Sequence, residues 1–114
     1  MATYFANALI NSLGTAEQQV VAVGSNTSTT ALGLSFTNLT GSIVEVSVRL
    51  TQSNNVGTVL TSAYFIKNVI VPPNQTLRAI NGGEKLVLTQ YMTMYVSSNT
   101  DDSIDMVMSY VNIV

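Results

Sequence analysis

Apolar and polar side chains alternate along most of the chain with a period of two residues. The segment VEVSVRLT, residues 44–51, is typical, because nearly every second residue is apolar and the residues between are polar. A strand places successive side chains on opposite faces of a sheet, so this period predicts strands with one buried face. The apolar residues expected to point inward are Leu32, Leu34 and Phe36; Val44, Val46, Val48 and Leu50; Leu86 and Leu88; Met92, Met94 and Val96; and Ile104, Met106, Met108 and Tyr110.

Short segments rich in Gly, Asn, Ser, Asp and Pro separate the predicted strands, and these residue types favour turns. The turn segments are 24–27, 38–41, 53–57, 72–74, 81–83 and 97–102. Strands spaced roughly 8–12 residues apart with such turns are typical of antiparallel sandwiches and barrels. We therefore predict an all-β fold: a single-domain antiparallel β-sandwich over residues 1–114, either immunoglobulin-like or jelly-roll-like.

The N-terminal segment from Thr3 to Leu13 is open to three interpretations. On a helix, Tyr4, Ala8 and Leu9 would form a short apolar stripe. A segment of this length is marginal for a helix. It fits equally a first strand or an N-terminal arm over residues 1–14.

The chain has very few charges for a soluble domain. Charged residues make up 9% of it, hydrophobic residues make up 46%, and the net charge is −2. An average domain has about a quarter charged residues, so we expect apolar outer surface to pack against other subunits in a homo-oligomer. The interface candidates are the outward residues Tyr91, Tyr95, Val107 and Val111, together with Tyr4 and Phe5 of the N-terminal segment.

The four basic residues, Arg49, Lys67, Arg78 and Lys85, are scattered along the sequence. Nucleic-acid binding needs a clustered basic patch, so we expect no direct nucleic-acid contact. No apolar run approaches the roughly 18 residues that a membrane helix needs, and the N-terminus lacks the pattern of a signal peptide. With no cysteine, the chain fits a protein folded in a reducing cytoplasm.

Catalytic chemistry has little to build on, because the chain contains neither histidine nor cysteine. A serine nucleophile would then depend on Lys67 or Lys85 as its base, and no SxxK motif lies near either. The stretch NGGEKLVL, residues 81–88, resembles a phosphate loop, but Lys85 precedes a leucine and a predicted strand. A tight turn explains it better, and we predict a non-enzymatic protein without a cofactor.

Two other sets of residues are weighed for binding. Asp101, Asp102 and Asp105 form the one acidic cluster of the sequence, but they lack the glycine and glutamate of a calcium loop, which favours a solvated turn. The larger aromatic residues of the strands would form either a sugar-binding platform or packing surfaces, and strand alternation favours packing. These aromatic residues are Tyr64, Phe65, Tyr91, Tyr95 and Tyr110.

Several segments, taken in order, resemble one family. They are Gly14-Thr15, LGLSFTNLTGSIVEVSV (32–48), AYFIKNVIVPPNQTL (63–77), NGGEKLVL (81–88) and SIDMVMSYVNIV (103–114). The chain is similar to small all-β virion proteins of tailed bacteriophages, described as tail, fibre or structural proteins. One departure stands at residues 89–92, where the family tends to have a Gly-Asp turn and this chain has TQYM. The departure puts the turn in doubt and would leave Tyr91 exposed.

The resemblance implies assembly into a virion in the cytoplasm of a bacterial host. The expected role is that of a capsid decoration or cement protein, or of a neck or tail component. The expected partners are major capsid, neck or tail proteins. The alternative is a receptor- or glycan-binding sandwich module of a tail fibre.

Overall fold

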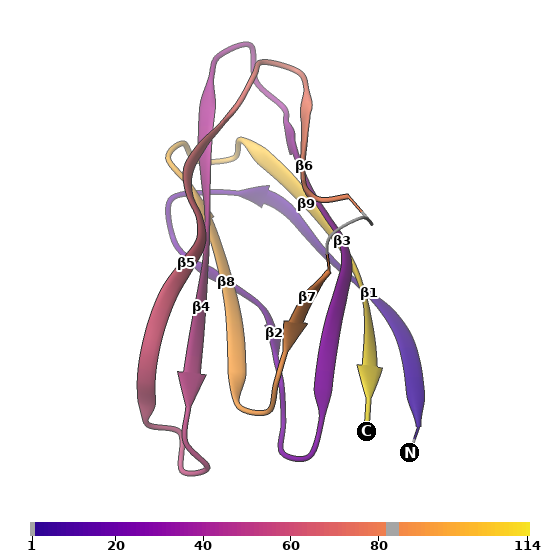
Figure 1. Ribbon diagram of the computed structural model, residues 1–114. Helices are drawn as coiled ribbons and strands as arrows, with labels where there is room; N and C mark the ends of the chain where they lie inside the picture. Colours follow the sequence, from indigo (N-terminus) through magenta and orange to yellow (C-terminus); the bar gives the residue numbers. More distant parts are fainter. Residues whose placement is uncertain (1, 82–84) are drawn as a thin grey trace.

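The computed structural model describes residues 2–81 and 85–114, which form nine strands and no helix. The strands lie in two facing layers (Figure 1). Their bounds are β1 Thr3–Leu13, β2 Gln18–Ala22, β3 Ser28–Asn38, β4 Val44–Ser53, β5 Val59–Val71, β6 Thr76–Ile80, β7 Leu86–Leu88, β8 Met92–Ser98 and β9 Ile104–Ile113.

The two sheets have interleaved strand orders. The first sheet runs β1-β9-β3-β6, and β7 pairs with β3 beyond the end of β6. The second sheet runs β2-β8-β4-β5, and the pairs of both sheets are antiparallel. The sandwich prediction is therefore confirmed.

The pairing is nested, as in a long hairpin rolled up on itself. β4 pairs with β5, β3 pairs with β6 and β7, β2 pairs with β8, and β1 pairs with β9. Successive pairs of this series alternate between the two sheets. This is the arrangement of a jelly roll, which of the two sandwich types considered is the one observed.

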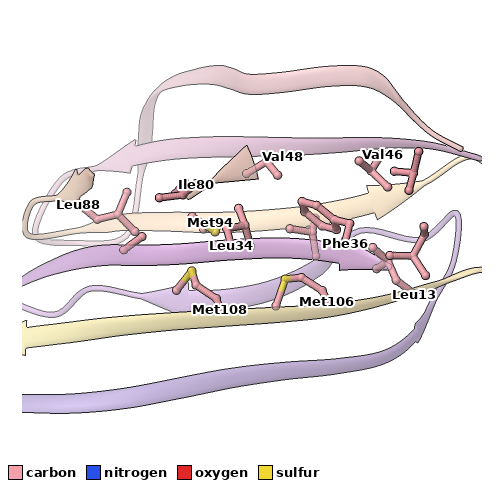
Figure 2. Close-up of a cluster of buried hydrophobic side chains, with 14 of the residues drawn as sticks. Leu13, Leu34, Phe36, Val46, Val48, Ile80, Leu88, Met94, Met106 and Met108 are labelled. Carbon is pink, nitrogen blue, oxygen red and sulfur yellow. The ribbon is translucent and has the colours of Figure 1, made fainter. Parts of the chain in front are cut away.

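The core lies between the sheets and is almost entirely aliphatic, sulfur-containing or aromatic. Figure 2 shows Leu34 and Phe36 of β3, Met106 and Met108 of β9, and Met94 of β8 gathered there. All five are at most 1% exposed. The inward alternation predicted for the segments 44–48, 94–96 and 104–108 is confirmed, because their apolar residues are buried and the residues between them are less so.

The inward position predicted for Leu32 is wrong. Ala31 pairs with Tyr110 and Gly33 with the next residue of β9, Ser109, so Leu32 is an extra residue in a β-bulge. The bulge shifts the alternation by one position. Ala31 and Leu34 enter the core, whereas Leu32 stays half-buried outside it.

The helix considered for the N-terminal segment is also wrong, since residues 3–13 form β1 at the margin of the first sheet. Tertiary pairing decides the outcome, because β9 offers a continuous strand partner for residues 3–10 and pairs again with Leu13. The pairing extends to Ala2 and Val114, whose N–H groups each donate to the carbonyl of the other residue at 3.1 and 2.9 Å. The two chain ends therefore lie side by side (Figure 1).

Asn38 closes the corner between β3 and β4 from a buried position. Its side-chain amide donates to the carbonyls of Ser42 and Val71 at 2.7 and 3.0 Å, and its oxygen accepts from Thr40. Asn38 begins one of the three Asn-x-Ser/Thr sequences of the chain. A side chain that is 1% exposed and bonded at both ends leaves no room for a glycan.

Candidate functional site

Apolar side chains gather on the outer face of the first sheet, the face away from the core. Residues directly opposite each other in an antiparallel pair share a face, and Phe5 lies opposite Val111, just as Leu9 lies opposite Val107. Phe5 is 80% exposed, Leu9 74% and Val107 44%. Through Thr30, the same cross-strand row reaches Val87 on β7. We call these residues the outer apolar band: Phe5, Leu9, Val87, Val107 and Val111.

A shallow hollow of about 360 Å³ adjoins the band where β3 passes between β9 and β6. Gly33, which follows the bulge, lines the hollow and contributes no side chain there. The rim is mixed in character, with apolar groups, hydroxyls and one guanidinium. Its lining includes Leu32, Gly33, Ser35, Thr76, Arg78, Val107 and Ser109.

The structure brings together three of the six predicted interface residues. Phe5, Val107 and Val111 lie in the outer apolar band. Tyr4 is 58% exposed but points to the other face of β1, as its place next to Phe5 requires. Tyr95 lies on the opposite side of the sandwich, on the outer face of β8.

Tyr91 occupies a turn between β7 and β8. The N–H of Met92 donates to the carbonyl of Thr89 at 3.2 Å, so a turn is present where the family pattern has its Gly-Asp pair. Tyr91 takes the left-handed conformation, with a φ of 65°. That region favours glycine or asparagine. The ring is half-buried, so it is less exposed than the sequence suggests.

Leu9 and Val87 belong to the band although the sequence analysis did not select them. Leu9 stands four positions after Phe5, so the two side chains share one face of a strand, where side chains alternate with a period of two. Val87 alternates with the inward residues Leu86 and Leu88, which pack in or against the core as predicted. Both residues follow from the period of two once the neighbouring strands are known.

The outer face of the second sheet carries a polar cluster. Arg49 binds Glu17 through two hydrogen bonds of 2.9 Å and donates a third, of 3.1 Å, to Ser62. Its guanidinium lies over the ring of Tyr95, 4.7 Å from the centroid. These hydrogen bonds lower the pKa of Glu17 below its ordinary 4.5 and raise that of Arg49. The charges of Arg49 and Glu17 are thus paired with each other within the chain.

The two lysines considered as catalytic bases lie in different surroundings. The ammonium of Lys67 sits 4.8 Å from the centroid of the Tyr64 ring, a cation–π contact. Lys85 is exposed immediately before β7. The turn predicted at 81–83 and Glu84 fall largely outside the described residues.

The acidic cluster fastens the connection between β1 and β2. The Asp101 carboxylate accepts hydrogen bonds from the N–H and hydroxyl of Thr15 at 3.0 and 3.1 Å, and these bonds lower its pKa. Asp105 accepts the N–H of Ser12 at 3.0 Å. Among residues 2–81 and 85–114, no three acidic side chains come together as metal ligands. Nor does any helix there have the length and hydropathy to cross a membrane.

No known family model and no curated protein matches the chain by sequence. Solved structures do match its fold. A protein of the infectious bursal disease virus particle superposes with a TM-score of 0.61 at 8% identity, over 96% of this chain and 30% of that one. A second structure of that virus gives 0.56 at 11% identity, over 99% and 31%.

A protein of Bacillus endospore appendages, described as disulfide-linked pili, gives a TM-score of 0.51 at 9% identity. The match covers 98% of this chain and 88% of that one. The chain therefore has a fold that occurs in subunits of virus particles and pili, and it spans about a third of the viral chains. Identities this low show the fold alone. This chain cannot form such a disulfide link, because its sequence contains no cysteine.

Proposed function

We propose that the chain is a structural subunit of a virus particle that works by packing against other subunits. The outer apolar band carries the proposal. It exposes aliphatic and aromatic side chains over three strands of a jelly roll, a fold found in virus particles. Exposed apolar groups that lie together, rather than singly, mark surfaces that a partner covers. The hollow at Gly33 adds a recess into which a partner side chain fits.

We propose further that the particle is a tailed bacteriophage. The resemblance of the segments 32–48, 63–77, 81–88 and 103–114 to phage virion proteins supports this choice. The chain would act as a capsid decoration or cement protein, or as a neck or tail component, bound to major capsid, neck or tail proteins. Repeated copies on a symmetric lattice would let modest contacts sum to firm attachment.

The proposal assigns no catalytic step and no cofactor to the chain. Its support is the chemistry of the charged groups. Lys67 is engaged with a tyrosine ring, Arg49 with Glu17, and Asp101 with the backbone. An assay of the purified protein against general esterase and glycosidase substrates is expected to give no activity above a heat-denatured control.

The decisive experiment compares two valine variants in particles purified from producing cells. Val107→Lys places a charge in the band, and Val59→Lys places one at an exposed position on β5. We expect Val107→Lys to lower incorporation into particles about tenfold or more, because an unpaired buried ammonium costs at least 1.4 kcal/mol. Val59→Lys should incorporate normally, and circular dichroism should show both variants folded. Absence of the chain from purified particles, or equal incorporation of both variants, would contradict the proposal.

A second candidate is a receptor- or glycan-binding module. The observation that favours it is the presence of Tyr64 and Tyr95 on the outer face of the second sheet, since sugars stack on aromatic rings. A cation already lies over each ring, however, which leaves less ring surface for a sugar. Glycan-array binding that disappears in Tyr64→Ala would support this candidate over packing.

A further inference from the structure

The β1 edge of the first sheet is free along its length. β1 bonds to β9 on one side, and no other strand pairs with it among the described residues (Figure 1). Ala2 and Val114 exchange both of their backbone hydrogen bonds. Because such pairs alternate in an antiparallel ladder, the even residues to Ile10 bond to β9. The odd residues Thr3, Phe5, Asn7 and Leu9 therefore direct N–H and C=O groups away from the sheet.

This edge lacks the features that normally keep strand edges apart. β1 contains no charged residue and no proline, and its regular part from Thr3 to Ile10 has no bulge. β5, the outermost strand of the second sheet, also contains no proline but differs in its charge and its pairing. It carries Lys67, its pairing with β4 has three register shifts, and Asn68 has a φ of 52°. Of the two long edges, β1 is the one suited to pairing with another strand.

The sequence of β1 is also self-complementary about Asn7. Reading outward in both directions gives Ala6 with Ala8, then Phe5 with Leu9. The next positions give Tyr4 with Ile10, and then Thr3 with Asn11. Small residues meet small ones, apolar residues meet apolar ones, and polar residues meet polar ones.

We propose that two copies of this chain pair antiparallel through their β1 edges, with the two-fold axis at Asn7. In this register the odd residues oppose odd residues, so their outward N–H and C=O groups bond to one another. Shifting the register by one pair in either direction would set Phe5 against Asn7 or Asn11. The self-complementary register alone pairs Phe5 with Leu9 of the other copy, on both sides of the axis.

The pairing makes one sheet that runs through both copies. Phe5 and Leu9, the most exposed members of the outer apolar band, would cover each other across the junction. The outer apolar band would then continue from one copy into the other. This inference rests on the edge and its sequence and holds for the isolated chain, whether or not the chain enters a virus particle.

A cysteine cross-link tests the register, because the chain has no cysteine of its own. In Asn7→Cys the two introduced thiols face each other at the axis, with Cα atoms about 5.5 Å apart, within the range of a disulfide. In Leu9→Cys the equivalent atoms are separated by four strand positions, roughly 13 Å. We expect mild oxidation to cross-link Asn7→Cys nearly completely and Leu9→Cys hardly at all. An equimolar mixture of Phe5→Cys and Leu9→Cys should cross-link as a heterodimer. Cross-linking of Leu9→Cys as efficient as that of Asn7→Cys would overturn the register.

Sedimentation of the uncross-linked protein tests the surface. The wild-type chain should be a dimer, and Phe5→Lys and Leu9→Lys should each raise the dissociation constant about tenfold or more. Asn7→Pro removes an outward N–H without breaking a bond to β9 and should also weaken the dimer. Val87→Lys, on the same face but away from the edge, is the matched control and should stay dimeric. A monomeric wild-type chain, or a dimer that survives the edge variants and dissociates in Val87→Lys, would overturn the proposal.

Discussion

The outer faces of the two sheets differ in the contacts that their exposed side chains make. On the second sheet, Arg49 binds Glu17 and lies over the ring of Tyr95, so these three side chains are partnered within the chain. On the first sheet, Phe5 and Val107 stand exposed in a row of apolar neighbours. The outer apolar band has no comparable polar contacts within the described part of the chain, which is why we propose that another subunit covers it. The comparison teaches that the ion pair and the ring contact of Arg49 lie on one outer face, whereas the cross-strand apolar row lies on the other.

The largest expected effect is a difference in the free energy of unfolding between substitutions on the inner and outer faces of the first sheet. Phe36→Ala removes a fully buried ring and should lower the free energy of unfolding by about 3–5 kcal/mol. Val107→Ala, one strand away on the outer side, should cost the dissociated chain less than about 0.5 kcal/mol. Urea denaturation at low protein concentration measures both. Equal losses would mean that the outer face already packs within the chain, and the contrast between the faces would fail.

The next effect concerns the second sheet. Arg49→Ala should lower the free energy of unfolding by about 0.5–1 kcal/mol at low salt, through loss of the ion pair and the ring contact. The loss should shrink as salt rises, because the ion pair is partly exposed. Arg78→Ala, an exposed arginine beside the hollow, is the matched control and should change stability by less. Similar losses in both variants would show that Arg49 is not specially placed.

The strands with strict alternation could be predicted from sequence, and the surfaces could not. β4, β8 and β9 each bury one apolar set and expose a polar or mixed set, which the period of two reports directly. β5 was harder to predict from sequence. Its first half is exposed on both faces, so its apolar residues do not follow a period of two. Leu32 was misplaced because a bulge changes the phase without leaving a mark in the sequence.

The outer apolar band needed the strand order as well. Phe5 and Val111 are 106 positions apart by number and meet only because the first and last strands pair. Val107 and Val111 could be selected because they alternate with Met106 and Met108. Tyr95 met the same criterion, but its strand lies in the other sheet. Local pattern thus identifies an outward side chain, and topology decides which outward side chains form one surface.

Acid should weaken the contact between Glu17 and Arg49 on the second sheet, with an effect smaller than those of the substitutions above. The pKa of Glu17 is lower in the folded chain than its ordinary 4.5, because Arg49 donates hydrogen bonds to the carboxylate. A group with a depressed folded pKa contributes stability above its unfolded pKa and loses it as pH falls through the folded value. Below pH 4.5, the thermal midpoint of Glu17→Gln should therefore fall less than that of the wild-type chain. The thermal midpoint of Val107→Thr should fall as much as that of the wild-type chain. An unchanged fall in Glu17→Gln would assign the acid sensitivity to other groups, with Asp101 first among them.

The smallest effect on stability should accompany a visible effect on solubility. Val107→Thr replaces a methyl group with a hydroxyl at nearly constant volume, so an exposed position should change in stability by less than about 0.5 kcal/mol. The change interrupts the outer apolar band, however, and should raise the ammonium sulfate concentration at which the protein precipitates. Val59→Thr makes the same replacement on β5, outside the band, and should shift precipitation less. Equal shifts would mean that exposed valines act singly, wherever they lie. A larger shift for Val107→Thr would show that the adjacency of the residues in the outer apolar band, rather than exposure alone, promotes association of this face.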